Sequence, residues 1–212
     1  MIVIINPNST ETMTDAMVDI ARSATLDVAI EGWTSHDGPP AIQGPRDGEA
    51  SIPPLLKLVR LAVAKGAQAI IIGCFDDTGL SQARKIAACP VIGIGQAAYH
   101  LAALAGERFS VVTTLDVSVP VLESNIQSYG LTGHLAKVRA SGVPVLDLET
   151  DPETANPKVI AEINRAVSED RVQSVVLGCA GMVGIPAIFG EDSPVRLVDG
   201  VVAATKIARI LI

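Results

Sequence analysis

The stretches "AIIIGC" (69–74) and "SVVLGC" (174–179) decide the fold, because each is a short apolar run that ends in glycine and cysteine. Short apolar runs rich in β-branched residues and bounded by glycine are typical of buried strands. The two cysteines are 105 residues apart (179 − 74), about half of the 212-residue chain. We therefore expect two similar halves, each with a strand that ends at a cysteine.

Two more pairs of segments repeat at nearly the same offset. "CPVIGIGQAA" (89–98) resembles "SPVRLVDGVVAA" (193–204), with Pro90 and Pro194 104 residues apart. "IVIINPNST" (2–10) and "SVVTTLDVS" (110–118) are both strands that open into polar turns, 108 residues apart. The near-constant offset favours an internal duplication with pseudo-twofold symmetry.

Strand-like and helix-like segments alternate along the chain, which predicts the α/β class with parallel sheets. Apolar residues follow helical spacing in 13–21 and 55–62. We expect two pseudosymmetric lobes, each a mainly parallel sheet flanked by helices, with the active site in the cleft between them. The first lobe comprises 1–96 plus 200–212, and the second comprises 97–199. The predicted strands are 2–5, 26–33, 69–72, 91–94, 109–112, 174–177 and 195–198.

The composition is that of a globular protein with a large core, since 49% of residues are hydrophobic and 18% are charged. The net charge of −7 argues against nucleic-acid binding. No apolar run is long enough to span a membrane. The three cysteines include no CxxC motif, so we expect free thiols in the cytoplasm. The three histidines lack the spacing of metal ligands, so we expect no metal site.

Cys74 and Cys179 occupy matched positions at the carboxyl ends of predicted strands, where parallel sheets bind ligands. Each precedes a predicted helix start, whose free N–H groups and dipole should lower the thiol pKa. Cys89 has no such context and is interpreted as a small core residue. Two opposed thiols suit inversion of a carbon next to a carbonyl: a thiolate removes a proton from one face and a thiol returns one to the other.

Two other classes stay open on this pattern. One is a non-catalytic protein that binds a small molecule between two lobes. The other is a thiol redox protein, which requires Cys74 and Cys179 to lie within disulfide distance.

The segments "NPNST", "GCFDDTGL", "ACPVIGIGQAA" and "LGCAGM" together resemble the aspartate/glutamate/hydantoin racemase superfamily, closest to its hydantoin racemase branch. The resemblance covers essentially the whole chain. It implies a cofactor-independent racemase, a homo-oligomer, whose catalytic cysteines map onto Cys74 and Cys179. The implied substrate is a 5-monosubstituted hydantoin; allantoin or an acidic amino acid is the alternative.

Polar strand ends supply the candidate substrate-binding residues. They are Asn6 and Asn8 in "NPNST", Phe75 and Asp76 in "CFDDTG", Thr113 and Thr114 in "TTLD", and Ala180 and Gly181 in "CAGM". Some have structural alternatives: turn formation for the asparagines, and carboxylates at a helix start for Asp76 and Asp77.

The segment 36–51 is rich in glycine and proline and is either a lid, a pocket wall or a plain connecting loop. The three histidines, Trp33 and Tyr129 are expected to be structural or on the surface rather than in the site.

Overall fold

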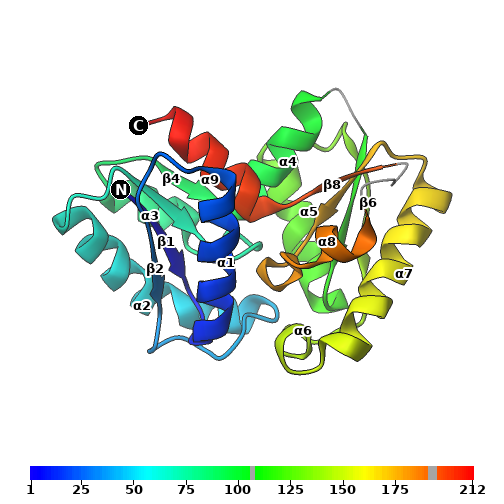
Figure 1. Cartoon of the computed structure of the whole chain (residues 1–212), viewed down its shortest axis with the longest axis horizontal. Helices are drawn as coiled ribbons and strands as arrows, with labels where there is room; N and C mark the ends of the chain where they lie inside the picture. Colours follow the sequence, from blue (N-terminus) through cyan, green and yellow to red (C-terminus); the bar gives the residue numbers. More distant parts are fainter. Residues whose placement is uncertain (106–107, 191–194) are drawn as a thin grey trace.

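The computed structural model describes residues 1–105, 108–190 and 195–212, in which strands and helices alternate (Figure 1). The strands are β1 (Ile2–Asn6), β2 (Ile30–Thr34), β3 (Ala69–Ile72), β4 (Val91–Gly93), β5 (Phe109–Thr113), β6 (Leu135–Ala140), β7 (Ser174–Leu177) and β8 (Arg196–Val198). The α-helices are α1 (Glu11–Ala24), α2 (Pro45–Ala64), α3 (Leu80–Ile86), α4 (Ile94–Leu104), α5 (Val119–Ser128), α6 (Asp147–Thr150), α7 (Pro152–Asp170), α8 (Ile185–Phe189) and α9 (Gly200–Ile210). Two short 3-10 helices are η1 (Asp116–Ser118) and η2 (Ala180–Met182).

The strands form two four-stranded parallel sheets with the same order. The first is β2-β1-β3-β4 and the second is β6-β5-β7-β8. The strands that carry "AIII" and "SVVL", β3 and β7, hold the same place in the two sheets. The predicted α/β class with two similar lobes of parallel strands is therefore confirmed, and Figure 1 shows the sheets side by side with α9 between them.

The central strands β1, β3, β5 and β7 are buried on both faces, as is typical of parallel sheets. On the first sheet, Ile2 and Ile4 belong to a core that continues into Val111 and Val176 of the second sheet. Val3 and Ile5 point the other way and pack with residues of α2 and α3. The outer face of the second sheet packs with residues of α6, α7 and α8. One shared core thus joins the two sheets.

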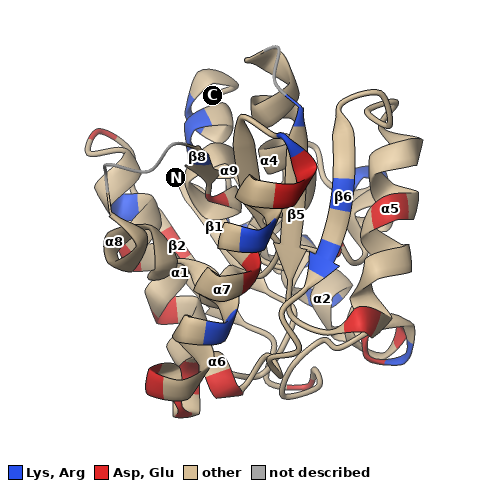
Figure 2. Ribbon diagram, turned by 90° about the vertical axis from the view of Figure 1, so that its right-hand side faces the viewer, with Lys and Arg blue, Asp and Glu red and all other residues tan. Residues whose placement is uncertain are grey.

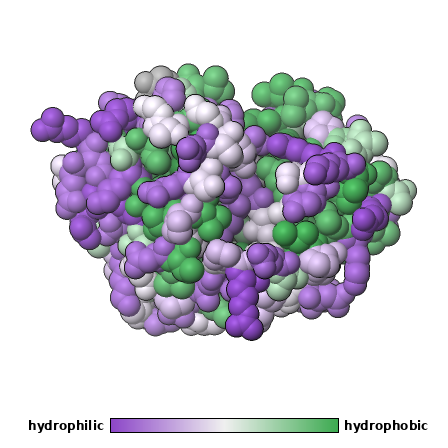
Figure 3. Space-filling model, turned by 180° about the vertical axis from the view of Figure 1, so that it is seen from behind, coloured by the Kyte–Doolittle hydropathy of each residue, from purple (hydrophilic) through white to green (hydrophobic). Residues whose placement is uncertain are grey.

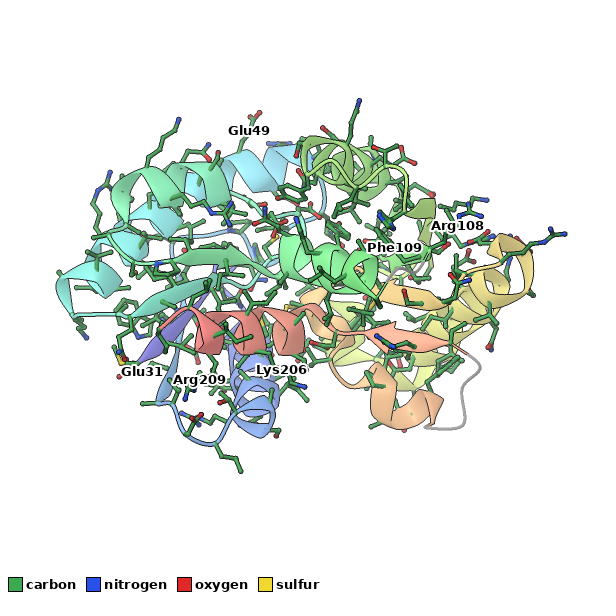
Figure 4. All side chains as sticks on the ribbon, turned by 90° about the horizontal axis from the view of Figure 1, so that it is seen from above. Glu31, Glu49, Arg108, Phe109, Lys206 and Arg209 are labelled. Carbon is green, nitrogen blue, oxygen red and sulfur yellow. The ribbon has the colours of Figure 1, made fainter. Side chains whose placement is uncertain are left out.

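Helices α4 and α9 pack in the middle of the molecule. The ring of Tyr99 on α4 stacks 6.1 Å from that of Phe109 at the start of β5, and Figure 4 shows Phe109 beside α4. Helix α9 returns to the first sheet, where Arg209 Nε donates to Asp27 Oδ2 at 2.9 Å.

The lobe boundaries at 96 and 200 remain a prediction. Ser193 and Pro194, which extend one of the sequence repeats, lie outside the described residues.

Three features differ from the sequence expectations. Strand β6 was not expected, because Lys137 and Arg139 break its apolar pattern. Strand β2 begins at Ile30, and residues 26–28 before it form a bend instead of extending the strand. The segment 36–51 is not a loop throughout, because α2 begins at Pro45, whose fixed φ suits the first turn of a helix.

No helix within the described ranges is long and apolar enough to cross a membrane.

Candidate active site

The two sheets end in the same way at the cysteines. The N–H of Gly73 donates to the Ile5 carbonyl at 2.8 Å, and the N–H of Gly178 donates to the Val112 carbonyl at 2.8 Å. Each glycine thus extends its central strand pair by one hydrogen bond, and each cysteine follows immediately. At Gly178 a Cβ atom would lie 2.8 Å from the Val112 oxygen, so a side chain there would push the two strands apart.

Cys74 and Cys179 line one small cavity between the sheets, about 30 Å³ in volume. That volume holds about one or two water molecules. All three cysteines are free thiols, and Cys89 lies away from this cavity. The structure therefore brings together the two thiols that occupy matched positions in the sequence.

The surroundings of the thiols do not lower their pKa, contrary to the sequence expectation. Burial raises the pKa of Cys179 to about 12 and raises that of Cys74 further, and the Asp76 carboxylate adds to both. The helix start expected after Cys74 lies six residues further on, at Leu80 of α3, and only the short η2 follows Cys179. Burial therefore outweighs the local dipoles.

Each sulfur nevertheless faces hydrogen-bond donors. The N–H of Asp76 is directed at Cys74 and the N–H of Gly181 at Cys179, so in both halves the donor is the residue two positions after the cysteine. The Thr78 hydroxyl also lies 3.6 Å from Cys74 Sγ. These donors oppose the effect of burial and would stabilise a thiolate once it forms.

Asp76 is the charged residue of the cavity wall. Among the described lining residues there is no Lys, Arg or His, and no hydrogen bond to the Asp76 carboxylate is found in that part of the chain. Burial raises the pKa of Asp76 to about 6. An ionised, unpaired carboxylate in a buried cavity favours a ligand that donates hydrogen bonds and disfavours a ligand that carries a carboxylate.

The "NPNST" turn places Asn8 in the cavity wall, whereas Asn6 lies behind it. The Asn6 amide is fully buried and donates to Asn8 Oδ1 at 2.9 Å and Thr14 Oγ1 at 3.1 Å. Asn8 Nδ2 has a sulfur contact, to Met13 Sδ at 3.6 Å. Asn6 thus has the turn-forming role, while the Asn8 amide group remains available to a ligand.

The other expected residues all line the cavity. Thr113 Oγ1 donates to the Gly178 carbonyl at 3.0 Å, which ties the first-loop threonine to the second cysteine segment. Thr114, Phe75, Ala180 and Gly181 complete the set. None of the three histidines, Trp33 or Tyr129 lines the cavity, as expected.

Some wall residues were missed by the sequence analysis. Ser118 brings a hydroxyl to the cavity from η1, and Met13, Ile42 and Val145 close it with apolar surface. Ile42 belongs to the 36–51 segment, which is therefore partly a pocket wall. Gln43 Oε1 accepts a hydrogen bond from Val145 N at 2.9 Å and joins this wall to the other half. Ser118 could have been found from its place at the end of the repeated "SVVTTLDVS".

No group of three or more His, Cys, Asp or Glu residues suited to a metal ion occurs in the described part of the chain.

Comparison with known proteins gives a consistent match over the full length. The family model described as Asp/Glu/Hydantoin racemase matches residues 2–208. A hydantoin racemase of Rhizobium meliloti is 42% identical over 99% of this chain and 87% of its own, and one of Pseudomonas sp. strain NS671 is 35% identical over 99% and 84%. The solved structure of allantoin racemase from Klebsiella pneumoniae superposes with a TM-score of 0.95 at 35% identity, covering 99% of this chain and 86% of that one.

Proposed function

Because the chain belongs to the Asp/Glu/hydantoin racemase family and is a racemase, we propose that it inverts C5 of 5-monosubstituted hydantoins. One observation carries the proposal. Cys74 and Cys179, from equivalent strand ends of two similar sheets, line the same cavity.

The proposed reaction is reciprocal proton transfer between the two thiols. One cysteine, as thiolate, takes the C5 proton, and the electron pair of the C–H bond moves into the adjacent ring carbonyl to form an enolate. The opposite thiol then delivers its proton to the other face of C5, and the enolate electrons form the new C–H bond. One cysteine ends protonated and the other deprotonated, so the reverse reaction uses the same pair. The two thiols supply both steps, and the proposal needs no cofactor.

The enolate oxygen needs hydrogen-bond donors where its charge develops. We assign this role to the Asn8 amide and the hydroxyls of Thr114 and Ser118, which line the cavity. Asn6 acts indirectly, since its amide holds Asn8 Oδ1. Phe75, Thr113, Ala180 and Gly181 are proposed to contact the ring through the cavity wall.

The charge of the wall supports a cyclic, uncharged substrate. A hydantoin ring presents N–H donors, and the Asp76 carboxylate is an acceptor without a partner among the described residues. An aspartate or glutamate substrate would bring a second carboxylate to Asp76 with no described cation in the wall to balance it. Acidic amino acids are therefore the weakest of the three substrate candidates.

Allantoin is the second candidate, favoured by the similarity to the Klebsiella allantoin racemase at a TM-score of 0.95. Its ring is itself a 5-substituted hydantoin, so the same C5 chemistry applies. The two candidates differ only in the side chain at C5.

The test is racemisation of single enantiomers of 5-benzylhydantoin, a 5-alkylhydantoin and allantoin, followed by loss of optical rotation, with aspartate and glutamate alongside. We expect turnover of the hydantoins, no turnover of the amino acids, and a loss of at least about 10³-fold in Cys74→Ser and Cys179→Ser. Cys89→Ser is the matched control and should retain parental activity. Full racemisation by either of the first two variants would contradict the two-thiol mechanism.

We further propose that the protein works in the cytoplasm, where its three free thiols would remain reduced, and as a homo-oligomer.

A further inference from the structure

The loop that carries Cys74 has an unusual backbone at Asp77. Asp77 has a φ of 51°, in the left-handed region that residues other than glycine adopt at some cost. Its N–H donates to the Cys74 carbonyl at 3.0 Å, so the Asp77 conformation directly sets the turn that follows the thiol. A strained residue persists where surrounding contacts hold it.

Three donors hold the Asp77 carboxylate. The Gly95 N–H donates to Oδ1 at 3.1 Å and the Gln96 N–H to Oδ2 at 2.7 Å, both in the first turn of α4. The Tyr129 hydroxyl donates to Oδ2 at 2.8 Å. Asp77 is only 7% exposed, so these bonds satisfy a buried carboxyl group. The carboxylate was expected at a helix start; it caps α4 and not the helix that follows it in sequence.

Two glycines make room for this carboxylate. A Cβ atom at Gly93 would overlap Asp77 Oδ1, and a Cβ at Gly95 would lie 2.9 Å from Asp77 Oδ2. The "VIGIG" segment therefore lacks side chains at the two positions where the Asp77 carboxylate packs against the backbone.

The end of α5 reaches the same loop from the other half of the molecule. Tyr129 follows the last residue of α5, and Asn125 Nδ2 on α5 donates to the Asp76 carbonyl at 2.8 Å. Helix α5 begins directly after η1, which contributes Ser118 to the cavity wall. Asp76 and Asp77 are thus hydrogen-bonded to residues at the end of α5, and α5 begins where η1, which carries the wall residue Ser118, ends.

We propose that Asp77 is a positioning residue for Cys74. Its hydrogen bond with Tyr129 holds the Cys74 loop in a fixed position relative to the cavity wall that contains Ser118. The inference rests on the proposed function, in which Cys74 is one of the two proton-transfer groups. Asp77 does not line the cavity, and it acts through the backbone of the loop.

The two tyrosines of the chain provide a matched pair of variants. Tyr129→Phe removes the hydroxyl that donates to Asp77 and keeps the ring, which lies 6.3 Å from that of Tyr99. Tyr99→Phe removes a fully buried hydroxyl that has no hydrogen-bond partner among the described residues. Any difference between the variants therefore reports the Asp77 hydrogen bond.

We expect Tyr129→Phe to lower kcat about tenfold with KM changed less than about twofold, because a misplaced catalytic group weakens the transition state more than ground-state binding. In D2O its ratio of C5 exchange to racemisation should rise for one enantiomer. That enantiomer is the one deprotonated by Cys179, which can still take and return the proton when Cys74 is out of place. Tyr99→Phe should match the parent in both measurements. Asp77→Asn, which replaces one acceptor oxygen by an amide group, should have a larger effect in the same direction.

Each outcome separates the inference from the function on which it depends. If Cys74→Ser abolishes racemisation while Tyr129→Phe behaves like Tyr99→Phe, the positioning role is wrong and the two-thiol mechanism stands. An equal rise of the exchange ratio for both enantiomers would also overturn it, because the bond would then not act on Cys74 alone. If Cys74→Ser racemises like the parent, the proposed function itself fails.

Discussion

At the scale of single residues, the cavity combines two thiols with one acid that makes both harder to ionise. Charged Asp76 raises the pKa of Cys74 and of Cys179, in addition to the effect of burial. It is also costly to the fold, since its own carboxylate is partly buried without a partner among the described residues. A residue that costs stability and lies in the cavity wall is best explained by a role in binding.

The Asp76→Asn variant should therefore be more stable and less active than the parent. Burial raises the pKa of Asp76 in the folded protein from the ordinary 3.8 to about 6. Between pH 3.8 and pH 6, the unfolded chain therefore releases a proton that the folded protein keeps. The free energy of unfolding of the parent falls across this range, and Asp76→Asn should gain about 2 kcal/mol above pH 6 and nothing below pH 4. Urea unfolding at pH 4 and pH 8 measures this, with the exposed Asp15→Asn as control.

Activity should change in the opposite direction. Because a neutral amide is a weaker acceptor than a carboxylate, kcat/KM for a hydantoin should fall about tenfold. The alkaline rise of the pH–rate profile should move to lower pH, since the charge that raises both thiol pKa values is gone. If the Asp76→Asn variant keeps full kcat/KM, Asp76 has no role in binding the substrate.

At the scale of elements, β6 shows how a strand with charged residues can form the edge of a sheet. Arg139 on β6 is buried and donates to Asp170 Oδ2 at 2.6 Å, Glu162 Oε1 at 3.1 Å and Glu169 Oε2 at 2.7 Å. These three acids lie on α7, and Figure 2 shows the basic bands of β6 beside the charged turns of α7. The ion pairs attach α7 to the sheet edge.

Arg139→Met should destabilise the protein by about 3–5 kcal/mol, because it leaves the buried Asp170 carboxylate without its ion-pair partner. Lys137→Met on the same strand is the control: Lys137 is exposed, and the change should stay within about 0.5 kcal/mol. Chemical unfolding of both variants gives the comparison. Equal stabilities would show that the Arg139 ion pairs contribute nothing to the fold.

The same elements show how far the sequence predicts the structure. Strands β3 and β7 and their cysteines were predicted because their apolar runs repeat at a fixed offset. Strand β6 lies at that offset from β2, since residue 30 plus 105 is residue 135, but its pattern of charges hid it. Asp77 could not be assigned from the sequence, because its partners Gln96 and Tyr129 are 19 and 52 residues away and only folding brings them together.

At the scale of the whole molecule, the two sheets share one core while their strand ends enclose the cavity. The surface seen from behind mixes hydrophilic and hydrophobic residues (Figure 3). The assembly of the chain into a homo-oligomer remains a prediction.

The most direct test of the central claim, one thiol on each face of the substrate, is enantiomer-resolved deuterium exchange at C5 in D2O. Cys74→Ser and Cys179→Ser are each incubated with each pure enantiomer of 5-benzylhydantoin. The two-thiol account predicts that neither variant racemises the substrate, and that each exchanges the C5 proton of one enantiomer only, the opposite one in the two variants. Exchange of the same enantiomer by both variants, or racemisation by either at the parental rate, would contradict it.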